Sequence, residues 1–195
     1  MTTKETFWER KKELNEDFIV LGSANPATST QIDEYEKKSG YEFSEDVKDF
    51  LQTFGTLLFE VKEDIWRRPK VFDVLPSWKF GYGFFVYGLS QDEETPIWMT
   101  YADKNQEALE FKEKTLGQMF FKRSGNGYRA YINKGIITIE YDKYDDSDIE
   151  IFEGNIYDFL ITEIDKLEKD YFEYINEKKP LHSPLDKVNA QLKKI

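Results

Sequence analysis

Apolar residues in the first third of the chain recur every three to four positions, which is the spacing of amphipathic helices. Thr28 with Gln31 matches a capping box, and Ser44 is a further candidate N-cap. We expect only a short apolar connector at Phe18–Leu21. The helices expected here span Thr3–Phe18, Thr28–Lys38 and Ser44–Phe54.

From Leu57 onward, short apolar runs bounded by turn residues indicate strands. Gly-Asn-Gly at 125–127 and Asn-Lys-Gly at 133–135 supply two of the turns. Lys104–Lys114 returns to helical spacing, and Asn155 with Asp158 opens a long amphipathic helix that ends near Asn176. The strands expected are Leu57–Val61, a central strand within 78–90, Pro96–Tyr101, Gly117–Lys122, Tyr128–Asn133, Ile136–Tyr141 and Asp148–Phe152.

Helices followed by strands and a closing helix predict an α+β domain. We expect an antiparallel or mixed sheet of about six strands, packed by N-terminal helices and a long C-terminal helix. The expected division is an N-terminal helix and loop at 1–27, one domain at 28–177 and a basic tail at 178–195.

The segment WKFGYGFFVYGLS, residues 78–90, combines aromatic residues with three glycines. In an extended chain its bulky residues share one face, and Gly81 and Gly83 leave the other face bare. A phosphate-binding loop would continue into a helix, whereas a strand pattern continues here. A base-stacking platform would interleave cations, and Lys79 is the only cation present. The pattern therefore predicts a buried central strand whose glycines admit a helix or another backbone.

Charge is distributed unevenly along the chain. The formal net charge is -11, and residues 142–177 hold thirteen acids against three lysines, a net of -10. A field of that sign disfavours nucleic acid as a ligand and favours a basic protein partner. A solubilising surface is the alternative. The chain has no cysteine, no apolar run of about 20 residues and no apolar N-terminal segment, so we expect a cytoplasmic protein without membrane contact.

The acidic loop that begins at Asp142 has part of the spacing of a calcium-binding loop. Tyr144 would occupy a ligand position, and Ser147 stands where the sharp turn requires glycine. A solvated hairpin loop is therefore expected instead. The isoleucines of the two flanking strands are expected to face inward, which would gather acids on the outer face of the sheet. The isoleucines are Ile137, Ile139, Ile149 and Ile151, and the acids are Glu140, Asp148 and Glu150.

Like charges on one sheet face destabilise each other, so a basic neighbour in the chain or on a partner is expected. Four cations around one hairpin form the strongest nucleic-acid candidate in the chain, with a solvated face or an internal counterpart of the acidic segment as alternatives. These cations are Lys122, Arg123, Arg129 and Lys134. His182 is the only histidine and the chain has no cysteine, so no metal site is predicted. The sequence also shows no pattern that indicates a cofactor or a catalytic group.

The segment TSTQIDEYEKKSGYEFSEDVKDFLQTFGTLLFE, from Thr28 to Glu60, joins a short helix of acids and lysines through Gly-Tyr-Glu-Phe to a second helix, which a glycine ends before a strand. It resembles the SUKH superfamily, which includes bacterial immunity proteins and fungal Smi/Knr-type cell-wall regulators. FGYGFFVYGLS with the following PIWM is similar to the central strands of that family, and GNIYDFLITEIDKLEKD is similar to its closing helix. Ser44 stands where proline is common, and the N-terminal helix and the basic tail lie outside the resemblance.

The resemblance implies a non-enzymatic immunity protein that binds a cognate toxin domain in the cytoplasm and blocks its active site. Many such toxins are nucleases with basic clefts, so an acidic surface would mimic their phosphate substrate. A Smi/Knr-type regulatory or scaffold module is the alternative, and a cation-dependent enzyme or calcium sensor is a third class. The predicted partner-binding residues are Asp142, Asp145, Asp146, Asp148 and Glu150, with Trp78 and Lys79 at the rim of a groove.

Overall fold

A computed structural model of the chain describes residues 2–62, 65, 83–92, 94–101, 116–123, 128–141 and 148–176. This part of the chain has an α+β fold with a seven-stranded sheet, N-terminal helices and a long C-terminal helix, as predicted. Its α-helices are α1 Thr3–Glu13, α2 Ser29–Ser39, α3 Glu45–Thr53 and α5 Ile156–Asn176. The helix predicted at Lys104–Lys114 and the tail at 178–195 lie outside the described residues.

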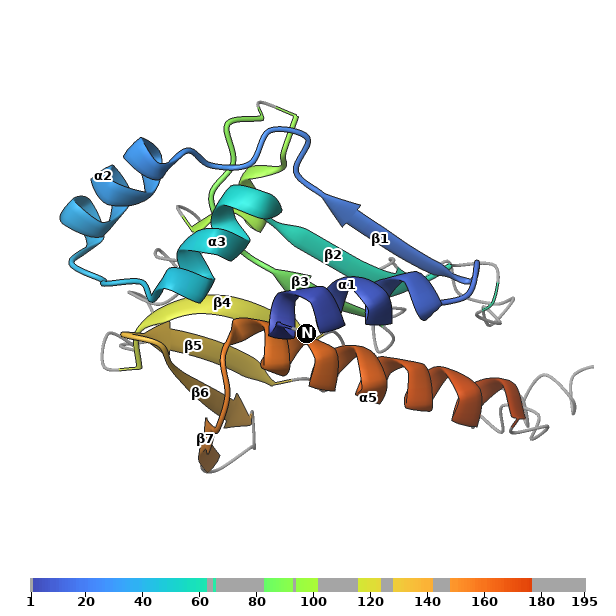
Figure 1. The fold of residues 1–195 in the computed structure, drawn as a ribbon. Helices are drawn as coiled ribbons and strands as arrows, with labels where there is room; N and C mark the ends of the chain where they lie inside the picture. Colours follow the sequence, from blue (N-terminus) through green and yellow to red (C-terminus); the bar gives the residue numbers. More distant parts are fainter. Residues whose placement is uncertain are drawn as a thin grey trace, which may run out of the picture.

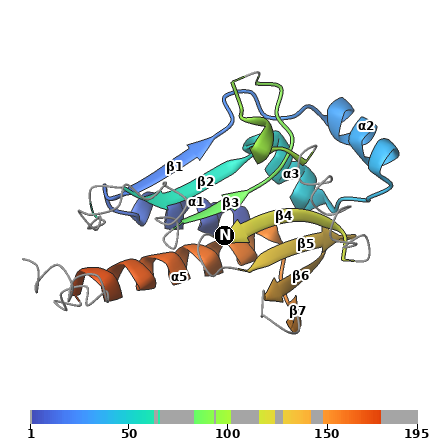
Figure 2. The ribbon, with the colours of Figure 1, turned by 180° about the vertical axis from the view of Figure 1, so that it is seen from behind.

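The sheet is a simple meander in which each strand pairs with the next one along the chain. The strand order is β1-β2-β3-β4-β5-β6-β7, and all six pairs are antiparallel. Figures 1 and 2 show the helices α1, α3 and α5 along one face of the sheet, with β1 and β7 at its two ends. The strands are β1 Phe18–Gly22, β2 Leu57–Val61, β3 Gly83–Val86, β4 Gln118–Arg123, β5 Arg129–Asn133, β6 Ile136–Tyr141 and β7 Asp148–Phe152.

Two predicted elements take a different form. Phe18–Leu21 is not a connector, because Phe18 begins β1 and pairs with Val61. The first helix accordingly ends at Glu13 instead of Phe18. Ile97–Met99 forms a 3-10 turn instead of a strand, and only Thr100 next to it forms a bridge, to Gly88. In both places the pairing partner comes from a distant part of the chain, which local spacing does not reveal.

Helix ends follow the sequence where a local hydrogen bond is available. Thr28 and Gln31 form the predicted capping box at α2, and Gly40 ends that helix in the left-handed conformation. At α5, Asn155 Oδ1 accepts hydrogen bonds from the amides of Tyr157 (2.8 Å) and Asp158 (3.1 Å). The prediction for α3 was half correct: Ser44 is its N-cap residue, but its side chain makes no capping hydrogen bond.

The segment with alternating aromatics and glycines is buried where the structure describes it. Phe84 and Val86 are fully buried, and β3 lies between β2 and β4 as predicted. The glycines make room for backbone, not for a helix. A Cβ on Gly83 would lie 2.6 Å from the Phe59 carbonyl oxygen, and one on Gly88 would lie 1.8 Å from that of Gly55. Residues 78–82 lie outside the described part.

We expect Gly88→Ala to lower the free energy of unfolding by about 3 kcal/mol, because the added methyl group meets a backbone oxygen that cannot rotate away. Gly40→Ala is the matched control: its Cβ meets nothing within 4 Å, and only the positive φ of 77° opposes it. That control should cost about 1 kcal/mol. Urea unfolding of both variants measures the difference, and equal losses would contradict the backbone contact at Gly88.

Candidate functional site

The predicted partner-binding residues divide into those within and those outside the described part of the chain. Asp148 and Glu150 lie on β7 and are exposed. Glu150 accepts a hydrogen bond of 3.0 Å from the Tyr141 hydroxyl. The other five residues lie outside the described residues: Trp78, Lys79, Asp142, Asp145 and Asp146.

The orientation predicted for β7 is wrong. Ile137 and Ile139 face inward as expected, but Ile149 and Ile151 are 55% and 66% exposed. The register places Phe152 beside Ile137 and Glu150 beside Ile139. The acids of β7 therefore lie on the face of the sheet that α5 covers, and its two isoleucines lie on the opposite face. The reason is Phe152, whose ring packs at 5.3 Å against Phe159 of α5.

Helix α5 carries much of the acidic charge of the sequence, and ion pairs within the chain offset much of it. From α1, Arg10 donates to Asp165 at 2.7 Å and to Glu168. All six acids of α5 have a hydrogen-bond or ion-pair partner in the chain: Asp158, Glu163, Asp165, Glu168, Asp170 and Glu173. The polarised charge of the sequence is thus not a uniformly acidic surface in the structure.

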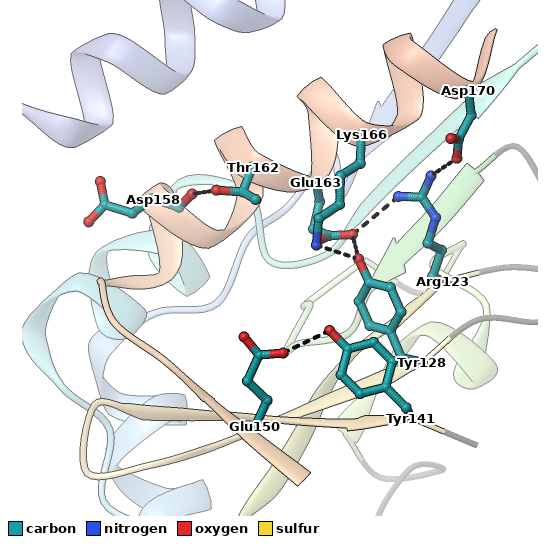
Figure 3. Close-up of polar contacts among 9 residues, drawn as sticks. All are labelled: Arg123, Tyr128, Tyr141, Glu150, Asp158, Thr162, Glu163, Lys166 and Asp170. Carbon is teal, nitrogen blue, oxygen red and sulfur yellow. Dashed lines mark hydrogen bonds and ion pairs between the residues drawn. The ribbon is translucent and has the colours of Figure 1, made fainter. Parts of the chain in front are cut away.

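The most buried of these acids, Glu163, joins α5 to the β4–β5 hairpin (Figure 3). Its carboxylate accepts hydrogen bonds from Arg123 (3.2 Å), Lys166 (2.8 Å) and the Tyr128 hydroxyl. Arg123 also donates to Asp170 at 2.5 Å. A buried carboxylate needs such partners because desolvation of an isolated charge is costly. We call Arg123, Tyr128, Glu163, Lys166 and Asp170 the α5 polar cluster.

Tyr128 is held as a neutral hydrogen-bond donor in the α5 polar cluster. Burial raises its pKa, and the adjacent Glu163 carboxylate raises the pKa further. Lys166 lies 5.1 Å above its ring and 3.1 Å from its hydroxyl. A cluster with its charges paired and its tyrosine neutral stabilises the packing of α5 on the sheet.

Three of the four basic hairpin residues, Arg123, Arg129 and Lys134, pair with acids of the chain itself. Arg123 pairs with two acids of the 142–177 segment, which confirms the internal-counterpart alternative for this residue. Arg129 lies 3.9 Å from Glu140, and Lys134 lies 3.5 Å from Glu42. The sequence indicated that basic residues of the hairpin could balance acids elsewhere in the chain. Which residues pair with which became known only from the structure.

Metal binding and membrane insertion are two further roles that side chains of the described residues could serve. No group of three or more histidine, cysteine or acidic side chains there could hold a metal ion. No helix there is long and apolar enough to cross a membrane. The exposed edge of the sheet at β7, with its acids on one face and its isoleucines on the other, is the candidate site.

Removing the central carboxylate tests the structural role of the α5 polar cluster. We expect Glu163→Gln to lower the free energy of unfolding by about 3 kcal/mol, because Arg123 and Lys166 then lose a buried counter-charge. Glu173→Gln on the same helix is the control. Its pair with Lys169 is exposed at 3.8 Å, so its loss should cost less than about 0.5 kcal/mol. Denaturant titration separates the two, and similar small losses would show that the cluster contributes little.

The raised pKa of Tyr128 predicts a loss of stability at high pH. An unfolded tyrosine loses its proton near pH 10, whereas folded Tyr128 keeps it, so the folded state loses stability as pH rises above that value. The advantage of the natural chain over Tyr128→Phe should shrink by about 1.4 kcal/mol between pH 9 and pH 11. Urea unfolding of both proteins at several pH values measures this difference in the free energy of unfolding. A difference that stays constant with pH would contradict the raised pKa of Tyr128.

Comparison with known proteins identifies no relative of the chain. No protein-family profile, curated protein or solved structure matches it. The resemblance to the SUKH superfamily therefore stays a prediction from the residue pattern.

Proposed function

We propose that this protein is a non-enzymatic immunity protein that binds a basic toxin domain in the cytoplasm and blocks its active site. The binding surface comprises β7 and the acidic loop before it. The observation that carries the proposal is the contrast between two groups of acids. Five of the six acids of α5 form ion pairs within the chain, whereas the printed hydrogen bond of Glu150, which is exposed on β7 at the end of the sheet, comes from a neutral hydroxyl.

The chemistry of this surface supports a basic partner. Among the described residues, Glu150 contacts a neutral hydroxyl and keeps its full charge available to a cation. Asp142, Asp145 and Asp146 precede it in sequence and add three charges of the same sign. Clustered carboxylates attract the lysine- and arginine-lined cleft of a nuclease as a phosphate backbone does, and they accelerate encounter. The SUKH-like pattern supports the same class of partner.

The partner in the decisive experiment is the product of the adjacent gene, co-expressed and purified with this chain. We expect charge reversal to lysine of Asp142, Asp145, Asp146, Asp148 and Glu150 to slow association at least about tenfold and to weaken its dependence on salt. Stopped-flow or surface-plasmon-resonance measurements between low and physiological salt give both quantities.

The matched control reverses five exposed acids elsewhere and so reaches the same net charge: Glu13, Glu16, Asp33, Glu34 and Glu94. It should bind nearly as fast as the natural chain. Equal slowing in both variants would mean that net charge alone, and not this surface, attracts the partner. Unchanged kinetics in the first variant would refute the proposed surface. An adjacent product without toxin activity would favour the regulatory alternative.

A further inference from the structure

One face of β7 is apolar and exposed, although a sheet normally shields such residues. Ile149 lies opposite Glu140 and Ile151 lies opposite Thr138 in the β6–β7 register. Ile136, on the same face of β6 as Thr138, is also 56% exposed. We call Ile136, Ile149 and Ile151 the edge patch. By register it lies on the face opposite Phe152, and therefore away from α5, on the strands β6 and β7 at one end of the sheet (Figures 1 and 2).

In the part of the chain that the structure describes, β7 has a strand, β6, on one side only. All five of its residues pair with β6 without a bulge, so the strand is regular to its edge. Edge strands are commonly protected by lysine, proline or a bulge, because their free N–H and C=O groups recruit another strand. The sequence Asp-Ile-Glu-Ile-Phe at 148–152 has no lysine, proline or bulge; its charges are the acids Asp148 and Glu150, which oppose pairing with an acidic strand and leave a basic strand favoured.

A second copy of this chain gains no favourable charge pairing on β7: centred on Ile151 it would set Glu150 opposite Phe152, and the other two registers centred within 149–151 would oppose like charges. Two copies paired antiparallel about Glu150 would place that carboxylate opposite its own equivalent. Pairing about Ile149 would place Asp148 opposite Glu150. Like charges directly opposite each other destabilise a strand pair. The same carboxylates would favour a strand with cations at the matching positions.

We propose that the edge of β7 accepts an extended strand of a partner protein in which apolar residues alternate with lysine or arginine. Its apolar side chains would pack on Ile149 and Ile151, and its cations would lie beside Asp148 and Glu150. Backbone hydrogen bonds provide affinity in this mode, and the alternating side chains provide specificity. The inference rests on the proposed function only in taking the partner to be basic; it adds the mode of binding and the pattern of the bound segment.

A synthetic peptide is the probe that tests the edge without the whole partner. We expect the full chain to bind acetyl-Thr-Val-Lys-Val-Lys-Val-Thr-amide saturably, with backbone amide shifts and slowed hydrogen exchange concentrated at residues 148–152. The same peptide with glutamate in place of lysine should bind at least about tenfold more weakly, since its charges oppose those of β7.

N-methylation distinguishes strand pairing from simple charge attraction. In a strand, the N–H groups of alternate residues point to opposite sides. The valine amides and the lysine amides of the peptide therefore point in opposite directions, and only one of the two sets can donate to β7. N-methylation of that set removes the hydrogen bonds to β7, and N-methylation of the other set leaves them in place. One methylated peptide should lose binding and the other should retain it. Equal binding by both, or shifts centred on the acids of α5, would overturn the inference.

A double variant, Ile149→Lys with Ile151→Lys, should weaken the lysine peptide at least about tenfold and remain folded, since both side chains are more than half exposed. Leu21→Lys on β1, the opposite edge strand, is the control; Leu21 is 55% exposed and its change should leave binding intact. No peptide binding, or binding that the double variant retains, would overturn the inference.

The natural partner separates failure of this inference from failure of the proposed function. If the five-acid reversal slows a basic partner but the double isoleucine variant binds it normally, strand addition is wrong and the proposed function stands. If the peptide binds β7 as expected but the chain binds no basic toxin, the proposed function is wrong and the edge remains a strand-binding site.

Discussion

The packing of Phe159 among three phenylalanines of the sheet is the contact on which the other features of this structure depend. The centroid of its ring lies 4.9 Å from the ring centroid of Phe121, 5.3 Å from that of Phe120 and 5.3 Å from that of Phe152. Phe120 and Phe121 are neighbours in the chain, and both reach α5 because the β4–β5 register shifts between Met119 and Phe121. This one side chain therefore connects the closing helix to the middle and to the edge of the sheet.

The same packing determines which chemistry β7 presents to solvent. Once Phe152 packs against the helix, the two-residue period of a strand turns Ile149 and Ile151 to the opposite face. Glu150, which lies between them, remains on the face that α5 covers, where the Tyr141 hydroxyl donates a hydrogen bond to it. An edge with carboxylates on one face and isoleucines on the other results from the anchoring of a single aromatic residue.

Electrostatics follow from where α5 lies in the fold. Arg10 and Arg123 are separated by more than a hundred residues in the sequence, yet both reach acids of the same helix. Pairing of this kind offsets much of the negative charge of α5. The charge counted along residues 142–177 is therefore not displayed as one acidic surface on that helix.

The sequence by itself determined the fold class, the extents of α2 and α5, and the buried central strand, because helical spacing, capping residues and runs of aromatic residues are local. It did not reveal β1 or the orientation of β7. Phe18 became a strand residue through pairing with Val61, and the isoleucines of β7 were turned outward by a contact of Phe152 with a helix. Only the tertiary structure decided these, since strand pairing and the choice of buried face depend on residues far along the chain.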